Sequence, residues 1–267
     1  MAIGGVGFLN QINQTNNAAN TSLRRISSGV QNPSAAYSPS AYSISARMNS
    51  KIGTLSQSRS NTQTANAMLN VASGGVSSTV DALTSLKEKI LQAANGTNQA
   101  SDVATINKSV QQTISTINDN ANVEFNGMKL LDGSRSVTVA GDNGYKTIQL
   151  GNMSAQGLGL ADSDGKSTLD LSSPEGIANA IETVDTALNS ALDLATDIGA
   201  TQQNLNASDA NYATSIASMT DAYSTEDDTD IAAEITKLKS AETQNQMALF
   251  AQKMFMHNNA SVLSLLQ

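Results

Sequence analysis

The sequence lacks cysteine and contains one histidine, His257. Disulfides, thiolate metal ligands and thiol catalysis are therefore excluded, and one histidine cannot supply a multi-histidine metal site. His257 stands in an apolar helical segment, which is more typical of a surface or interface residue than of a catalyst. We therefore predict no catalytic residue, no bound metal and no cofactor.

Aromatic residues are scarce as well. They make up 3% of the chain, tryptophan is absent, and hydrophobic residues together reach 39%. Aromatic side chains supply much of the buried area in ordinary globular cores. At 267 residues the chain is long enough to bury a core, but this composition suits long helices that bury narrow apolar strips.

Basic runs and long apolar runs are missing too. The formal net charge is −8, so electrostatic capture of nucleic acid or of an anionic membrane is not expected. No segment approaches the roughly 20 apolar residues of a membrane span. The first residues also lack the basic and apolar regions of a cleaved secretory signal.

The chain offers instead apolar residues at helical spacing. A first helix is predicted from Leu9 to Gly29, followed by a loop or broken helix over residues 34–43. Its apolar positions recur at alternating steps of three and four, the spacing of a coiled-coil strip. These positions are Leu9, Ile12, Asn16, Ala19, Leu23 and Ile26.

Two much longer helices are predicted from sustained heptads. The second helix covers residues 44–95 and the fourth covers about 172–223, each about 50 residues or about 75 Å long. A third helix lies between them, with Ser101 as its expected N-cap. Ser172 is the expected N-cap of the fourth helix. Because the chain turns back between the long helices, we expect them to pair antiparallel.

A small β region separates the third and fourth helices. Residues 137–139 and 146–150 flank the turn sequence Asp142-Asn143-Gly144, which predicts a hairpin. A further short strand is expected at 168–171. The acidic residues at 226–230 fit the start of a final helix better than a cation site, because acidic side chains favour a helix N-terminus.

The final helix, predicted from 231 to 267, is apolar almost all the way round between residues 247 and 256. Phe250 and Met254 point away from the side shared by Ala248, Phe255 and Val262. One neighbour cannot cover both sides, so we expect the two ends of the chain to pair and then to contact other molecules. The residues of this final helix predicted for self-assembly are Leu249, Phe250, Phe255, Val262, Leu263 and Leu266, together with the six positions of the first helix.

The expected fold is therefore mainly α, a long antiparallel helical coiled-coil bundle with a small β-hairpin region at about 134–171. We expect three parts. Residues 1–43 pair with residues 224–267, and residues 44–223 form a helical rod that carries the hairpin.

Three sequence segments resemble one family. Residues 25–30 read RISSGV, residues 124–133 read EFNGMKLLDG, and residues 262–267 read VLSLLQ. All three are similar to segments of bacterial flagellins, and the order of predicted elements also resembles that family. Residues 133–172 leave no room for extra outer domains, so the chain resembles a short flagellin.

This resemblance implies a structural subunit that polymerises into the extracellular filament of the bacterial flagellum. It further implies export through the flagellar type III channel without a cleaved signal peptide. The implied partners are other copies of the chain, an export chaperone, and the junction and cap proteins. Alternative functions are a hook–filament junction protein and a secreted coiled-coil adhesin. The C-terminal match and the apolar segment 247–256 argue against the adhesin.

Two segments depart from the family pattern. The connector at residues 36–41, AYSPSA, lacks the charged residues and glycine usual in flagellins. Many flagellins also carry an Arg-rich patch that an innate immune receptor recognises. The corresponding segment here is 83–91, where Lys87 and Glu88 keep that character but Ser85 and Lys89 do not. We therefore expect weak recognition by the flagellin-sensing Toll-like receptor.

Overall fold

The computed structural model describes residues 2–134, 136–142 and 144–265, and it divides into two compact units. The terminal unit contains residues 1–53 and 216–267, and the rod unit contains residues 54–215. In the described part of the chain no helix is both long and apolar enough to cross a membrane.

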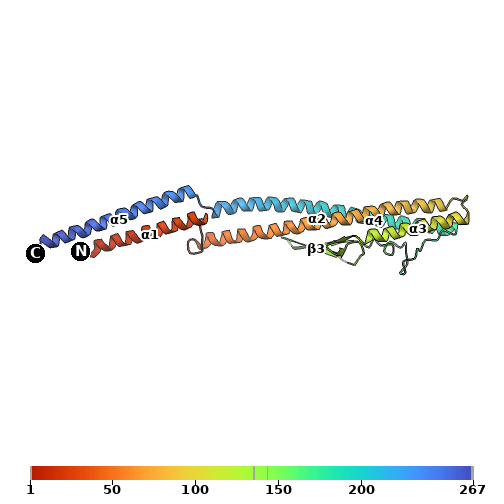
Figure 1. Ribbon diagram of the computed structural model, residues 1–267, viewed down its shortest axis with the longest axis horizontal. Coiled ribbons are helices and arrows are strands. Elements are labelled where there is room, and N and C mark those ends of the chain that lie inside the picture. Colours follow the sequence, from red (N-terminus) through yellow and green to blue (C-terminus); the bar gives the residue numbers. More distant parts are fainter. Residues whose placement is uncertain (1, 135, 143, 266–267) are drawn as a thin grey trace. The chain divides into compact units, whose positions relative to one another are not determined.

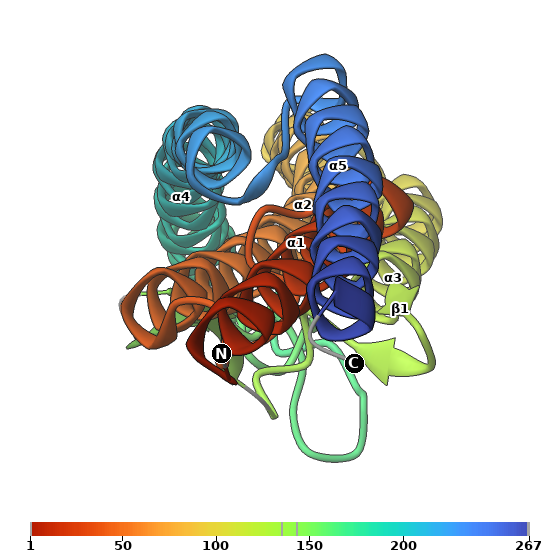
Figure 2. The ribbon, with the colours of Figure 1, turned by 90° about the vertical axis from the view of Figure 1, so that its left-hand side faces the viewer.

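In the terminal unit, α1 (Ala2–Ser28) and α5 (Ile231–Leu265) run side by side (Figures 1 and 2). α1 ends where predicted, because Gly29 adopts φ 71° and its N–H bonds to the Arg25 carbonyl at 2.8 Å. Asp230 caps α5, since its carboxylate accepts the Ala233 N–H at 3.0 Å. Among the described residues no cluster of three or more acidic or histidine side chains could hold a metal ion.

The connector between α1 and α2 is shorter than predicted. α2 spans Pro39–Ala93, so the helix begins five residues before the expected position. Pro39 stands at its first position, where the missing N–H costs no helical hydrogen bond. The sequence Ser38-Pro39 therefore opens the helix here, and residues 39–43 form its first turn instead of a loop or a broken helix.

In the rod unit, α2 and α4 (Pro174–Asp227) run antiparallel. Their polar contacts pair rising residue numbers on α2 with falling numbers on α4. Arg59 Nε lies 3.1 Å from Asp209 Oδ1, and Asn70 accepts a hydrogen bond from Gln202 at 2.8 Å. The contacts Asn66–Asn206 and Lys87–Asp185 lie on the same pair of helices. The antiparallel pairing and the predicted heptads are confirmed here.

Two columns of residues on α2 are buried. Both columns repeat every seven residues: Leu55, Thr62, Leu69, Val76, Leu83 and Ile90, and Ser58, Ala65, Ala72, Thr79, Leu86 and Ala93. The apolar members join a core with residues of α3 (Ala100–Ala121), the β region and α4. A helix that contacts several neighbours needs a wider buried face than a two-helix coiled coil.

The starts of α3 and α4 differ from the predicted N-caps. The Gln99 N–H donates to Asp102 Oδ2 at 3.0 Å, so Gln99 rather than Ser101 is the N-cap of α3. Ser173 rather than Ser172 caps α4, because its hydroxyl accepts the Gly176 N–H at 3.0 Å. The hydroxyl of Ser172 instead donates to Asp170 at 2.6 Å.

The predicted hairpin is confirmed as β3 (Ser136–Gly141) paired antiparallel with β4 (Gly144–Gln149). A second, two-residue hairpin joins β1 (Glu124–Phe125) to β2 (Met128–Lys129) through Asn126 and Gly127, both at positive φ. The strand expected at 168–171 is absent. Leu169 and Leu171 are buried there in an irregular segment, so alternating burial occurs without a strand partner.

Gly74 and Gly75 occupy different environments within α2. A Cβ on Gly74 would meet nothing within 4 Å, whereas one on Gly75 would lie 2.8 Å from Leu131 and 3.1 Å from the Asn120 carbonyl. We expect Gly74→Ala to raise the free energy of unfolding by about 1 kcal/mol through helix propensity. Gly75→Ala should lose that gain to the close contact. Chemical denaturation compares the two variants, and an equal gain at Gly75 would contradict this explanation of the pair.

Candidate self-assembly surface

The contact between α1 and α5 is narrow and largely polar. Phe8 packs on Phe255 with ring centroids 5.9 Å apart, Asn245 donates to Asn16, and Ser22 donates to Glu234. Thr15 and Ser22 are the buried residues of α1 among the described side chains. α5 contributes buried Glu234, Ala241 and Ala248.

This contact corrects the register of the predicted strip on α1. Ile12, Ala19 and Ile26 are half-buried as expected, but Leu9, Asn16 and Leu23 are exposed. Leu9 keeps 50% and Leu23 keeps 55% of its surface in solvent. Phe8, Thr15 and Ser22 occupy the inner positions instead. Leu9 and Leu23 thus face outward, while Phe8, Thr15 and Ser22 face α5.

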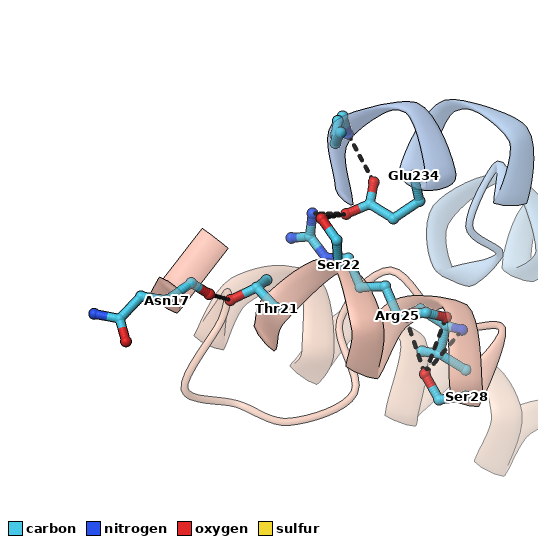
Figure 3. Close-up of polar contacts among 8 residues, drawn as sticks. Asn17, Thr21, Ser22, Arg25, Ser28 and Glu234 are labelled. Atoms are coloured by element: carbon cyan, nitrogen blue, oxygen red, sulfur yellow. Dashed lines mark hydrogen bonds and ion pairs between the residues drawn. The ribbon is translucent and has the colours of Figure 1, made fainter. Parts of the chain in front are cut away.

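Glu234 is the main polar anchor of the pair, and Figure 3 shows its carboxylate directed from α5 to Ser22 and Arg25 of α1. Oε1 accepts the Ser22 hydroxyl at 3.0 Å and lies 3.4 Å from Arg25 Nη1. Oε2 lies 2.8 Å from Lys237 Nζ. Glu234 keeps 3% of its surface exposed. Hydrogen bonding to Lys237 and Ser22 and the charge of Arg25 lower the pKa of this carboxyl, although desolvation opposes them.

A lowered pKa makes the stability of this contact depend on pH. The ionised carboxylate stabilises the fold fully above its usual pKa of 4.5, and this contribution is lost as the pH falls through the lower folded pKa. We therefore expect the residues of α5 around Glu234 to open more readily below pH 4.5. Hydrogen exchange at pH 7 and pH 3.5, corrected for intrinsic exchange rates, measures the opening free energy. Glu234→Gln should remove the pH dependence, and a pH dependence that persists in this variant would contradict the assignment.

The outer surface of α5 is strongly apolar. Met247, Phe250 and Met254 recur at steps of three and four on the side opposite buried Ala248, and Phe250 keeps 67% of its surface exposed. Leu249 and Met256 form a second exposed row on the other flank of Ala248, and Val262 is exposed near the end of the described helix. The side chains of Leu263 and Leu266 lie outside the described residues. Exposed apolar rows on this scale are typical of an interaction surface.

Phe255 differs from its neighbours because it already contacts Phe8 of the same chain. Leu249 and Phe250 have no such cover, since each keeps at least half of its surface exposed. On α1, Val6, Leu9 and Leu23 extend the exposed apolar surface. We refer to the exposed residues Met247, Leu249, Phe250, Met254 and Met256 as the outer face of α5.

A backbone contact closes the terminal unit at the other end of the pair. The Gln31 N–H donates to the Asp227 carbonyl at 2.6 Å, and the Thr229 N–H donates to the Gly29 carbonyl at 3.0 Å. Val30 and Asp228 form an antiparallel bridge between these bonds. Asp227 is buried, and its hydrogen bond to the phenol raises the pKa of Tyr223. Sequence reasoning missed this contact because no side-chain pattern predicts an isolated bridge.

The segment compared with the immune-receptor patch is bound within the rod unit. Lys87 forms an ion pair with Asp185, and Lys89 Nζ donates to Thr113 Oγ1 at 2.7 Å. Ser85 is half-buried, whereas Glu88 is exposed. Both lysines therefore have partners inside the molecule.

Comparisons with known proteins agree on one family. A family model for the bacterial flagellin N-terminal helical region matches residues 7–136. Flagellin FlaB2 of Treponema pallidum (strain Nichols) is 29% identical over 276 residues, covering 96% of this chain and 95% of that protein. The flagellar filament 33 kDa core protein of Treponema phagedenis is 30% identical over 210 residues, or 73% of each chain.

A solved structure supports the fold independently. The structure described as that of a flagellar hook-associated protein from Vibrio parahaemolyticus superposes with a TM-score of 0.61 at 17% identity. The match covers 71% of this chain and 99% of that one, so the two share a fold. Together with the sequence relatives and the paired terminal helices, these findings establish that the chain belongs to the bacterial flagellin family.

Proposed function

We propose that this flagellin polymerises into the flagellar filament through the outer face of α5 and the exposed apolar residues of α1. The observation that carries this proposal is the outer face itself. α5 is already paired with α1 on one side, yet Phe250 and its neighbours remain exposed on the other. A second set of neighbours is needed to cover that side.

The proposed contact between subunits is repeated at every addition to the polymer. Full burial of one large apolar side chain contributes about 1.5–3 kcal/mol. A head-to-tail contact that does not close on itself generates an open helical polymer, and each added subunit repeats the same contact. Small changes in one side chain therefore alter the affinity of every addition.

The parts of the chain then have distinct roles. Residues 1–43 and 224–267 form the assembling part, and residues 44–223 form a rod stabilised by its own core. The residues that we assign to self-assembly are Leu9, Ile12, Asn16, Ala19, Leu23, Ile26, Leu249, Phe250, Phe255, Val262, Leu263 and Leu266. The role is structural, without catalysis or a cofactor.

The location and the other partners follow from the family. We propose that the subunit is exported through the flagellar type III channel without cleavage of a signal peptide and assembles outside the cell. An export chaperone, junction proteins and a cap protein would act on it before and during assembly. Nucleic acid and membrane are not among the proposed partners.

Electron microscopy of the purified chain tests the proposal and separates it from the alternatives. Long helical filaments would support a filament subunit. Short collars would indicate a hook–filament junction protein, and separate rods would indicate a secreted coiled-coil adhesin.

We further propose that this protein activates the flagellin-sensing Toll-like receptor weakly. Lys87 and Lys89 are held by Asp185 and Thr113, and Ser85 offers no positive charge. We expect Ser85→Arg combined with Lys89→Leu to raise the response in a receptor-reporter cell assay. Exposed Lys108→Leu serves as a control for surface charge. A strong response to the unmodified protein would show that this patch is wrongly assigned.

A further inference from the structure

A hollow of about 290 Å³ lies within the terminal unit, beneath the contact that joins residues 29–31 to residues 227–229. Its apolar wall comes from Val30, Pro33, Tyr42 and Ala46. Its polar lining consists of Ser28, Asn32, Ser45, Asn49, Tyr223 and Asp227. Small-molecule sites occupy about 300–1,000 Å³, so this hollow suits one long side chain better than a large ligand.

Ser45 is the first sign that the hollow is incomplete. It keeps 4% of its surface exposed, and its hydroxyl has no hydrogen-bond partner. A serine within a helix commonly bonds to the carbonyl four residues earlier, as Thr62 does with Ser58. Buried polar side chains without a partner are rare in native proteins, and each one calls for an explanation.

Asp227 is the second sign. Its side chain lines the same hollow and keeps 5% of its surface exposed. Among the described residues it forms no ion pair, and Tyr223 supplies its hydrogen bond. Buried carboxylates are normally paired with a cation. The hollow therefore presents one acidic and one neutral acceptor without a cationic partner.

We propose that this hollow receives the guanidinium group of Arg24 from a second copy of the chain. The stem of the arginine would lie against Tyr42 and Pro33, and its N–H groups would donate to Asp227 and Ser45. A guanidinium carries five donors and no acceptor, which matches a carboxylate beside a free hydroxyl. This inference rests on the proposed function, because only an assembly brings a second copy close.

The positive charge of Arg24 and its position on α1 make it the residue that we assign to this contact. A chain with a net charge of −8 repels its own copies, so assembly gains from each opposite-charge contact. The side chain of Arg24 is exposed and makes no hydrogen bond or ion pair with the described residues. It follows exposed Leu23 on the side of α1 turned away from α5, which the proposed assembly would cover.

A double-mutant cycle on polymerisation tests this contact. The critical concentration is measured by sedimentation for the wild type, Arg24→Gln, Asp227→Asn and the double variant. We expect each single variant to raise the critical concentration about tenfold, because a charge-assisted hydrogen bond is lost in each. The double variant should match the single variants, since both changes remove one contact.

Asp221→Asn is the matched control, because it removes the same charge from an exposed position of α4 in the same unit. It should leave the critical concentration within twofold of the wild type. Arg24 is exposed, so its variant tests the proposal even where Asp227→Asn impairs folding. Independent effects that multiply in the double variant would overturn the proposal, and so would unchanged polymerisation of Asp227→Asn, which would mean that water fills the hollow. Either result leaves the proposed function intact as long as the wild type forms filaments.

Discussion

Replacing Phe250 with aspartate should abolish polymerisation while leaving the subunit folded. Phe250 keeps 67% of its surface exposed on the side of α5 opposite α1, so the change removes little packing within the chain. Burial of phenylalanine in an interface contributes about 1.5–3 kcal/mol, and an unpaired buried carboxylate adds a further penalty. The critical concentration should therefore rise about a hundredfold or more.

Sedimentation measures the loss of polymer, and circular dichroism checks that the helices remain. Tyr145→Asp is the matched control, because Tyr145 is an aromatic residue with 82% of its surface exposed on β4 of the rod unit. It should polymerise normally. Normal filaments from Phe250→Asp would show that the outer face of α5 takes no part in assembly.

The largest expected effect on folding lies in the rod. Leu83 is fully buried in the core shared by α2, α3, α4 and the β region. Leu83→Ala should lower the free energy of unfolding by about 2–5 kcal/mol, because it removes buried methyl groups and leaves a cavity. Chemical denaturation of the monomer measures the difference.

Leu91 provides the internal comparison for that measurement. It lies on the same helix eight residues later and keeps half of its surface exposed. Leu91→Ala should change the free energy of unfolding by less than about 0.5 kcal/mol. Equal losses at the two positions would contradict the placement of the core.

The rods were predictable from the sequence because their burial is periodic. Leu69, Val76 and Leu83 recur every seven residues with little interruption, and the polar positions between them pair across to α4. The β3–β4 hairpin was predictable from its turn residues. A helix that packs against several neighbours along its whole length shows a regular spacing of apolar residues in its sequence.

The register of α1 was harder to predict, and the reason is physical. Alternating steps of three and four place Leu9 and Leu23 on one strip, and large apolar residues usually face inward. In this chain the pair with α5 is lined by Thr15 and Ser22, while the leucines face outward. Exposed leucines are unfavourable in a monomeric globular protein, but they fit a subunit whose outward apolar side chains are buried by neighbouring subunits.

Glu234 and the hollow around Ser45 were missed for a related reason. A single glutamate near the start of a helix reads as a favourable contact with the helix dipole. Glu234 is buried against Ser22 and Arg25, which lie more than two hundred residues away in the sequence. The N-caps at Gln99 and Ser173 were missed by two residues and one residue, because the carboxylates of Asp102 and Asp170 bond to Gln99 and Ser172.

The central claim is that the outer face of α5 becomes buried between copies of the chain. Hydrogen exchange of wild-type filaments and of monomer, measured over residues 245–256, tests it most directly, because burial between subunits slows the opening of a helix. We expect exchange in this segment to slow at least tenfold on assembly, more than in the α2 core around Leu83. Filaments in which residues 245–256 exchange as fast as in the monomer would contradict the claim.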